Sequence, residues 1–371
     1  MNSPGTKIER NKPPLSFYTP LLAQWDITSG CNFKCTFCLS NSGRRLTNEL
    51  DWEQARVVVD RLHEGGVIFL RILGGEPFYR KDILKVMQLA ADKGMLLSFS
   101  TNASLVSEKY AEQLKEIEDS INYFQVSLYG TDTPAYERQT LDPRGFDLVR
   151  RGIANLKKYD LNPFLFWVLT ADNMDQLEAA YNLTREWELP TLRISLKLNI
   201  GRGTADCSDS VNNPQLWSEA VRHFSLLNQL VIKYGSPTIQ LHARPLLGEF
   251  LYRRTGLPYF YITCKAASTM VYLDANGECS PCPFAAFMPD SYLYPLPSWE
   301  TMSILKHKLA DIWQSGLFER YRELRNPDNN PGKMFRNCPH FKSGICDPCI
   351  FTPCTCRETI EMVKTGGSTV D

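Results

Sequence analysis

The chain has 371 residues, and its 41 Lys and Arg are balanced by 41 Asp and Glu, so the formal net charge is zero. It is 43% hydrophobic and 22% charged, which supplies a sizeable core and excludes global disorder. Without a basic excess, nucleic acid is not an expected partner. The N-terminus is polar and no run of about 18 apolar residues occurs. We therefore expect no membrane partner and predict a cytoplasmic protein.

Residues 1–20 form a polar arm, and the sequence up to about residue 200 then alternates between short apolar runs and longer amphipathic segments. The expected strands are 22–28, 67–73, 96–101, 123–129, 163–170 and 192–198. The expected helices are 51–64, 80–93, 107–118, 145–158 and 173–187. This alternation predicts a parallel α/β fold, either a doubly wound sheet or a partial barrel. In both folds, ligands bind at the C-terminal ends of the strands.

The sequence changes character after the polar, turn-rich stretch 201–213, which predicts a boundary. A helix is expected over about 214–234, and helical pattern returns over 301–325. Between them, an apolar run at 271–273 is followed by Asp-Ala-Asn-Gly, which predicts a β-hairpin with an Asn-Gly turn.

Twelve cysteines stand out in a chain without a secretion signal. In a reducing compartment such a count indicates metal binding or thiol chemistry rather than disulfides. The cysteines are clustered: three lie within Cys31–Cys38, eight lie between Cys264 and Cys356, and Cys207 stands alone.

The first group is Cys31, Cys35 and Cys38, in C-x3-C-x2-C spacing directly after the first expected strand. Three thiolates are one short of the four that hold a structural zinc or a closed iron–sulfur cluster. An iron–sulfur cube on three thiolates leaves one iron open to an exogenous ligand. A zinc site completed by a distant His or Cys is the alternative.

Polar residues follow the other expected strands in order. Gly74-Gly75-Glu76-Pro77 ends the second, Thr101-Asn102 the third, Gln125 and Ser127 lie in the fourth, and Arg193 lies in the sixth. Two glycines let the backbone approach a ligand closely, and a glutamate suits an ammonium group. Each residue could be an ordinary hydrogen-bonded group, but their order along successive strands favours one shared site.

These motifs, over roughly residues 20–200, resemble those of radical S-adenosylmethionine (SAM) enzymes. The resemblance implies an α/β fold with a partial (β/α)6, TIM-like barrel and a [4Fe–4S] cluster on the three cysteines. S-adenosyl-L-methionine would bind the open iron and be cleaved to a 5′-deoxyadenosyl radical. The implied SAM contacts are Gly74, Gly75 and Glu76 at its amino group, Ser127 at its ribose or carboxylate, Arg193 at its carboxylate and Phe37 at its adenine.

The second group of cysteines comprises Cys264, Cys279, Cys282, Cys338, Cys346, Cys349, Cys354 and Cys356. Its opening, Cys264-x12-Gly277-x4-Cys282, resembles the start of the SPASM domain, which implies one or two auxiliary [4Fe–4S] clusters that relay an electron. The last five depart from that domain's usual spacing. Two closed clusters need eight thiolates. Either Cys279 supplies the eighth or one cluster keeps an open site; a single cluster with spare cysteines and a zinc knuckle are the alternatives.

We therefore expect an arm (1–20), a radical SAM barrel (21–235) and a C-terminal cysteine-rich, SPASM-like domain (236–371). Four strings resemble mycofactocin-type peptide maturases, namely 38–45, 201–204, 277–284 and 311–318. The resemblance implies an oxidoreductase that decarboxylates or cross-links a ribosomally made peptide, with a flavodoxin- or ferredoxin-type reductant.

Only about twenty residues precede the first expected strand, too few for a leader-binding domain, so a peptide substrate would need a separate leader-peptide-binding protein. The alternative is a decarboxylase or dehydrogenase of a small-molecule natural-product intermediate. A zinc-binding interaction protein is disfavoured, because Gly74-Gly75-Glu76-Pro77 would have no reason to accompany the cysteines.

Overall fold

A single curved sheet organises the computed structural model, which describes residues 17–198, 200–205, 214–243, 245–260, 264–284 and 301–325. In these residues the strand order is β11-β10-β9-β1-β2-β3-β4-β5-β6-β7-β8. The strands are β1 (Leu22–Asp26), β2 (Phe69–Leu73), β3 (Leu96–Thr101), β4 (Ile121–Ser127), β5 (Phe164–Leu169), β6 (Thr191–Leu196), β7 (Thr238–His242), β8 (Tyr259–Phe260), β9 (Met270–Leu273), β10 (Glu278–Ser280) and β11 (Met302–Ser303). Neighbours from β9 to β8 are parallel, and β10 and β11 are antiparallel additions at one edge.

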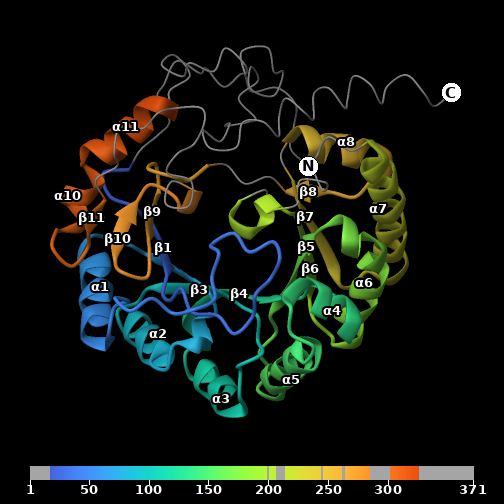
Figure 1. Ribbon diagram of the computed structural model, residues 1–371, viewed down its shortest axis with the longest axis horizontal. Helices are drawn as coiled ribbons and strands as arrows, with labels where there is room; N and C mark the ends of the chain where they lie inside the picture. The colour runs from blue at the N-terminus through green and yellow to red at the C-terminus, as the bar shows by residue number, and fades with distance from the viewer. Residues whose placement is uncertain are drawn as a thin grey trace.

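Helices surround the outer side of this sheet in Figure 1. They are α1 (Trp52–Glu64), α2 (Ile83–Asp92), α3 (Glu108–Glu116), α4 (Thr133–Thr140), α5 (Gly145–Lys158), α6 (Leu177–Glu186), α7 (Pro214–Tyr234), α8 (Pro245–Thr255), α10 (Leu309–Trp313) and α11 (Gly316–Arg325). The short 3-10 helices are η1 (Pro77–Tyr79), η2 (Glu118–Ser120), η3 (Ala171–Gln176) and η4 (Gly201–Ala205). None of the helices in the described segments is long and apolar enough to cross a membrane.

The core lies between the helices and the sheet. Strand β2 shows the pattern, because Leu70 and Ile72 are fully buried while the residues between and beside them are half-buried. Helix α1 contributes its own buried stripe, which contains Val58 and Leu62. This alternation leaves every second side chain of the parallel strands on the inner face of the barrel.

The six expected strands and five expected helices are confirmed to within a few residues, and so is the α/β barrel-like fold. The hairpin is also confirmed: β9 and β10 pair antiparallel around a turn in which Gly277 has a φ of +80°. Helix α4 was not expected, although Asp132 caps it by accepting a hydrogen bond from the Ala135 amide.

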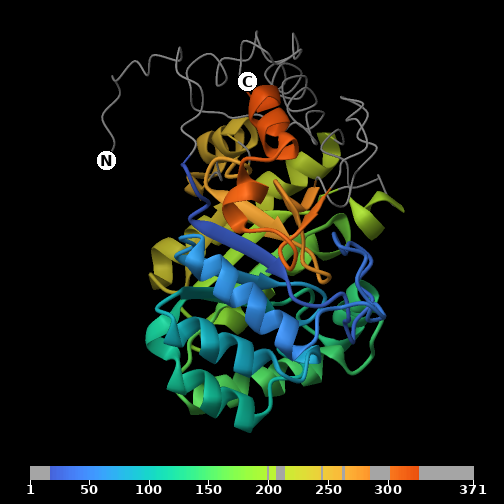
Figure 2. The same cartoon turned by 90° about the vertical axis from the view of Figure 1, so that its left-hand side faces the viewer.

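The sheet also extends beyond the six expected strands. Strand β7 pairs with β6 and β8 with β7, while β9 pairs in parallel with β1 at the other side. Figure 2 shows the β9–β10 hairpin beside the long blue strand β1.

Candidate functional site

The three clustered cysteines lie on the segment 27–50 between β1 and α1, which we call the cluster loop. It crosses the middle of the barrel in Figure 1. The loop is closed on itself, because the Cys31 amide donates to the Gly43 carbonyl (2.8 Å) and the Gly43 amide donates to the Ser29 carbonyl (3.1 Å). A tighter turn forms where the Cys38 amide donates to the Cys35 carbonyl (3.2 Å). The sequence spacing therefore brings all three thiols to one strand end.

The thiols lie in a protein environment that suits a ligand set. Burial raises the pKa of Cys31 to about 12 and that of Cys35 further, and the neighbouring thiols add to both shifts. Polar groups approach the sulfurs: the Phe33 amide donates to Cys31 Sγ (3.4 Å), and the Ser40 hydroxyl and the Cys38 thiol are hydrogen-bonded with 3.6 Å between Oγ and Sγ. Such contacts tune iron–sulfur clusters. Nowhere in the described ranges do three Cys, His, Asp or Glu side chains converge on a single metal ion.

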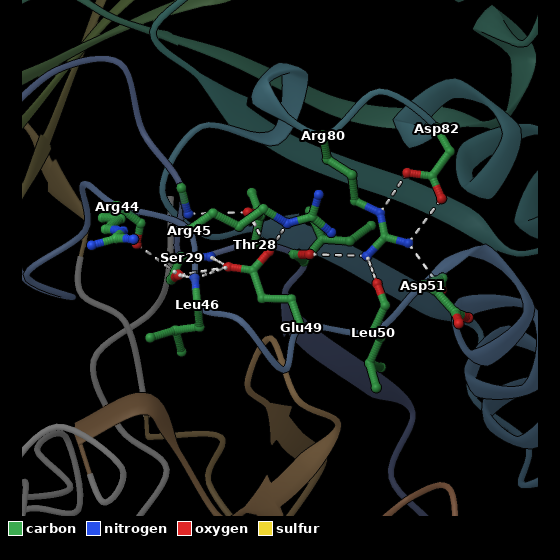
Figure 3. A network of polar contacts seen from close by, with 12 residues as sticks. Thr28, Ser29, Arg44, Arg45, Leu46, Glu49, Leu50, Asp51, Arg80 and Asp82 are labelled. Carbon is green, nitrogen blue, oxygen red and sulfur yellow. Dashed lines mark hydrogen bonds and ion pairs between the residues drawn. The ribbon is translucent and has the colours of Figure 1, made fainter.

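Glu49 connects the two ends of the cluster loop, where the loop leaves β1 and where it approaches α1 (Figure 3). Its carboxylate accepts hydrogen bonds from Thr28 Oγ1 (2.8 Å), from the Ser29 amide (2.8 Å) and from Arg45 Nε (2.7 Å). Burial favours the neutral acid, but these bonds outweigh it and hold the pKa of Glu49 below its usual value. The charged carboxylate thus ties the residues that leave β1 to those that approach α1.

Arg80 also connects the two ends of the cluster loop, and its side chain is only 1% exposed. Its guanidinium forms a two-pronged ion pair with Asp82 (2.8 and 2.9 Å). It also donates to the carbonyls of Ile27 (3.3 Å), Leu50 (2.8 Å) and Asp51 (3.2 Å), so all five of its N–H groups have acceptors (Figure 3). Neither Glu49 nor Arg80 could be predicted as an anchor from the sequence, because most of their partners are distant backbone groups.

Arg202, in η4 after β6, holds the far side of the cluster loop. Its Nε donates to the Cys35 carbonyl (2.8 Å), its amide to the Cys38 carbonyl (3.0 Å) and its Nη1 to the Ser42 carbonyl (2.7 Å). Gly201 before it has a φ of +60°, and a Cβ there would lie 2.4 Å from the Cys38 carbonyl oxygen. The string 201–204 therefore holds the backbone between two expected metal ligands.

Gly74 and Gly75 let the end of β2 meet the cluster loop. The Gly75 amide donates to the Thr28 carbonyl (2.7 Å) and the Glu76 amide to the Gly30 carbonyl (2.8 Å). A Cβ on Gly74 would lie 2.4 Å from the Thr28 oxygen, and one on Gly75 would lie 2.2 Å from the Gly30 oxygen. Only glycine fits so close an approach.

Glu76 is fully engaged with the protein. Its Oε1 accepts from Thr101 Oγ1 (2.6 Å) and from the Phe78 amide (3.1 Å), and its Oε2 accepts from the Asn102 amide (2.7 Å). Burial raises the pKa of Glu76 to about 7. The Asn102 side chain continues the network to 4.0 Å from Cys31 Sγ. Glu76 therefore joins β2 to β3 beside the loop, and its expected contact with the amino group of SAM stays a prediction.

Phe37 and Ser127 meet at Tyr129, just beyond the end of β4. The Phe37 ring packs edge-on against Tyr129 with 4.8 Å between ring centres, and the side chains of Ser127 and Tyr129 are hydrogen-bonded. Both residues thus lie beside the cluster loop at the strand ends.

Arg193 lies deeper, on the inner face of β6. It donates to Gln240 Oε1 (3.0 Å from Nε) and to the Tyr123 hydroxyl, and its guanidinium stacks on the Tyr123 ring at 4.6 Å. Tyr123 is near the start of β4, whereas Ser127 ends that strand. The expected contact between Arg193 and the carboxylate of SAM stays a prediction.

Three cysteines of the second group lie in the described residues. Cys264 is half-buried, and Cys282 is nearly buried with the Tyr321 hydroxyl 3.7 Å from its sulfur. Cys279 is fully buried within β10, which pairs with both β9 and β11. This position favours a core role for Cys279. The other five expected ligands lie outside the described residues, namely Cys338, Cys346, Cys349, Cys354 and Cys356.

Comparison with known families agrees with this geometry. Residues 25–184 match the radical SAM superfamily, and residues 264–340 match the SPASM iron–sulfur cluster-binding domain. The protein is therefore a radical SAM enzyme with a C-terminal SPASM domain. The first domain implies a [4Fe–4S] cluster and SAM, and the second implies auxiliary iron–sulfur clusters.

Relatives with known names match both domains. The mycofactocin maturase MftC of Mycolicibacterium smegmatis is 29% identical over 330 residues, which cover 87% of this chain and 76% of MftC. The AdoMet-dependent heme synthase of Methanosarcina barkeri is 25% identical over 335 residues, 88% of each chain. Among solved structures, Streptococcus suis SuiB bound to S-adenosylmethionine superimposes with a TM-score of 0.68 at 16% identity, over 90% of this chain and 73% of SuiB.

Proposed function

We propose that this enzyme acts in the cytoplasm on a ribosomally synthesised peptide, by C–H abstraction that leads to decarboxylation or cross-linking. The observation that carries the proposal is the similarity to mycofactocin maturase, which spans 87% of this chain and so includes both domains. SuiB, which shares the fold, has also been solved with its precursor peptide SuiA.

The residues at the strand ends fit the cofactors. Cys31, Cys35 and Cys38 would hold the cluster. Thiolates are the ligands, and burial raises the pKa of Cys31 and of Cys35, so loading would release protons from these two thiols. When bound, the cluster and SAM supply the radical chemistry. The glycine cradle at 74–75 would receive the methionine end of SAM.

The remaining contacts follow the same rim. From beside Tyr129, Ser127 would meet the ribose or carboxylate of SAM and Phe37 would meet its adenine. Glu76 would meet the amino group, and its hydrogen bonds to β3 would hold the glycine cradle in place. The SPASM domain would keep its auxiliary clusters on Cys264, Cys282 and the five later cysteines, where they would accept or relay an electron. We propose a flavodoxin or ferredoxin as reductant and a separate protein that binds the leader peptide.

A second candidate is a decarboxylase or dehydrogenase of a small-molecule natural-product intermediate. It is favoured by the 25% identity to AdoMet-dependent heme synthase over 88% of the chain.

Anaerobic reconstitution tests the shared chemistry. The wild type should hold roughly eight to twelve iron atoms and release 5′-deoxyadenosine from SAM after reduction. Cys35→Ala should abolish that release, whereas Cys207→Ala, outside both cysteine groups, should retain it. Zinc without iron would contradict both candidates.

Mass spectrometry separates the two candidates. Reduced enzyme and SAM are incubated with any short peptide encoded beside the gene, with and without any small leader-binding protein encoded there, and in parallel with carboxylated small molecules. A mass change confined to a peptide supports maturation, and one confined to a small molecule supports the second candidate.

A further inference from the structure

The inner face of the barrel carries an arginine, Arg71, whose side chain has no hydrogen-bond or ion-pair partner among the described residues. Arg71 lies in β2 between the fully buried Leu70 and Ile72, so its side chain is on the opposite, inner side, in register with Gln24 of β1. The residue is half-buried, and its guanidinium makes no hydrogen bond or ion pair with the described residues. Burial lowers its pKa, but an arginine remains charged at neutral pH.

A second guanidinium faces the same interior. Arg193 also alternates with fully buried residues, and in Figure 1 its strand β6 lies across the barrel from β1. It is close enough to Arg71 for its charge to lower the pKa of Arg71. Its partners Gln240 and Tyr123 are neutral, so they orient the guanidinium without cancelling its charge.

His242 completes this set at the end of β7. Burial, reinforced by the charges of Arg193 and Arg71, lowers the pKa of His242 to about 4. At neutral pH it is therefore an uncharged imidazole, which can donate one hydrogen bond without adding repulsion.

The carboxyl group of Asp26, on the inner face of β1, is not a counter-ion for these arginines. Asp26, at the end of β1, accepts a hydrogen bond from the Tyr272 hydroxyl (2.8 Å), and neither arginine contributes to its electrostatic environment. Arg71 and Arg193 thus lie in a partly desolvated interior without a counter-ion among the described residues, and a further cation, Lys265, lies near Arg71, since burial and the charge of Arg71 both lower its pKa. Leaving buried charge unpaired is costly, and an arriving anion would remove that cost.

We propose that Arg71, Arg193 and His242 form an anion subsite that receives a carboxylate of the substrate. For Arg193 this assignment replaces the contact with the carboxylate of SAM that the family resemblance implies, because Arg193 lies beside Tyr123, near the start of β4. Guanidinium groups recognise carboxylates through paired, charge-assisted hydrogen bonds. The subsite lies below the rim where we place SAM, so it would hold a substrate that enters the barrel. The inference rests on the proposed function, and it applies equally to a peptide carboxylate and to that of a small molecule.

The test uses cluster-loaded enzyme and para-fluorobenzoate, observed by fluorine NMR, with neutral para-fluorobenzamide as its counterpart. We expect the benzoate to bind with a dissociation constant of the order of 1 mM and the benzamide to bind at least about tenfold more weakly. Arg71→Met should weaken the benzoate about tenfold without lowering the melting temperature, since it removes an unpaired buried charge. Arg56→Met, at an exposed position on α1, is the matched control and should leave binding unchanged.

Equal binding of the two probes, or unchanged benzoate binding in Arg71→Met, would overturn the subsite. So would loss of SAM binding in Arg71→Met, because that result would assign Arg71 to the cofactor. Substrate-free release of 5′-deoxyadenosine is measured in the same samples: if it persists while the subsite fails, the proposed function stands. Displacement of the benzoate by acetyl-trialanine or by propionate supports the subsite in either case and distinguishes a peptide from a small-molecule source.

Discussion

Arg80→Ala should destabilise the protein markedly, although Arg80 is not expected to touch cofactor or substrate. The change removes five hydrogen bonds from a side chain that is 1% exposed and leaves Asp82 and three carbonyl groups without their donor. Removing one partner of a buried ion pair costs about 3–5 kcal/mol. With an unfolding entropy of about 2.1 cal/mol/K per residue, this cost corresponds to a melting temperature lower by about 4–6 °C.

The measurement is thermal unfolding of anaerobically reconstituted protein, followed by tryptophan fluorescence. The matched control is Arg56→Ala, because Arg56 forms a 3.0 Å ion pair with Glu53 in which both side chains are at least half-exposed. Such pairs contribute about 0–1 kcal/mol, so this variant should melt within about 1 °C of the wild type. If the two alanine variants melt at the same temperature, Arg80 does not hold the cluster loop as the geometry indicates.

Three further changes test the site. Gly75→Ala would place a Cβ 2.2 Å from a carbonyl oxygen of the cluster loop and should lower the iron content by about four atoms, whereas Gly43→Ala, with nothing within 4 Å, should load normally. In the presence of EDTA, the iron–sulfur absorbance of the Arg202→Ala variant should decay severalfold faster than that of the wild type. Equal decay rates would contradict the role of Arg202 in holding the cluster loop. Asp26 has a folded pKa raised to about 7 by burial, so its ionisation penalty grows as pH rises from the unfolded pKa to the folded one. The free energy of unfolding of the wild type, relative to that of Asp26→Asn, should therefore fall by about 2–3 kcal/mol between pH 5 and pH 8. The same dependence on pH in both proteins would count against a buried acid at position 26.

The sequence allowed the barrel strands and the first cysteine group to be predicted, because alternation and motif order are local properties. Helix α4 was missed since its eight residues carry little amphipathic pattern, despite the cap at Asp132. Glu49 and Arg202 could not be found by spacing, because their partners are 3 to 167 positions away and most are backbone groups. Glu76 illustrates a different limit: its residue type suggested a ligand for an ammonium group, and only the structure shows its oxygens already accepting three hydrogen bonds.

The parallel pairing of β1 with β9 sets an order of events during synthesis. Leu22 is in register with Met270, so one edge of the first strand stays open until almost 250 further residues have been made. At about 5–20 residues per second, that interval lasts about 10–50 s on the ribosome. During it the nascent chain presents an unpaired, apolar strand edge of the kind that promotes aggregation. Chaperone supply during translation should therefore affect how much soluble enzyme a host produces.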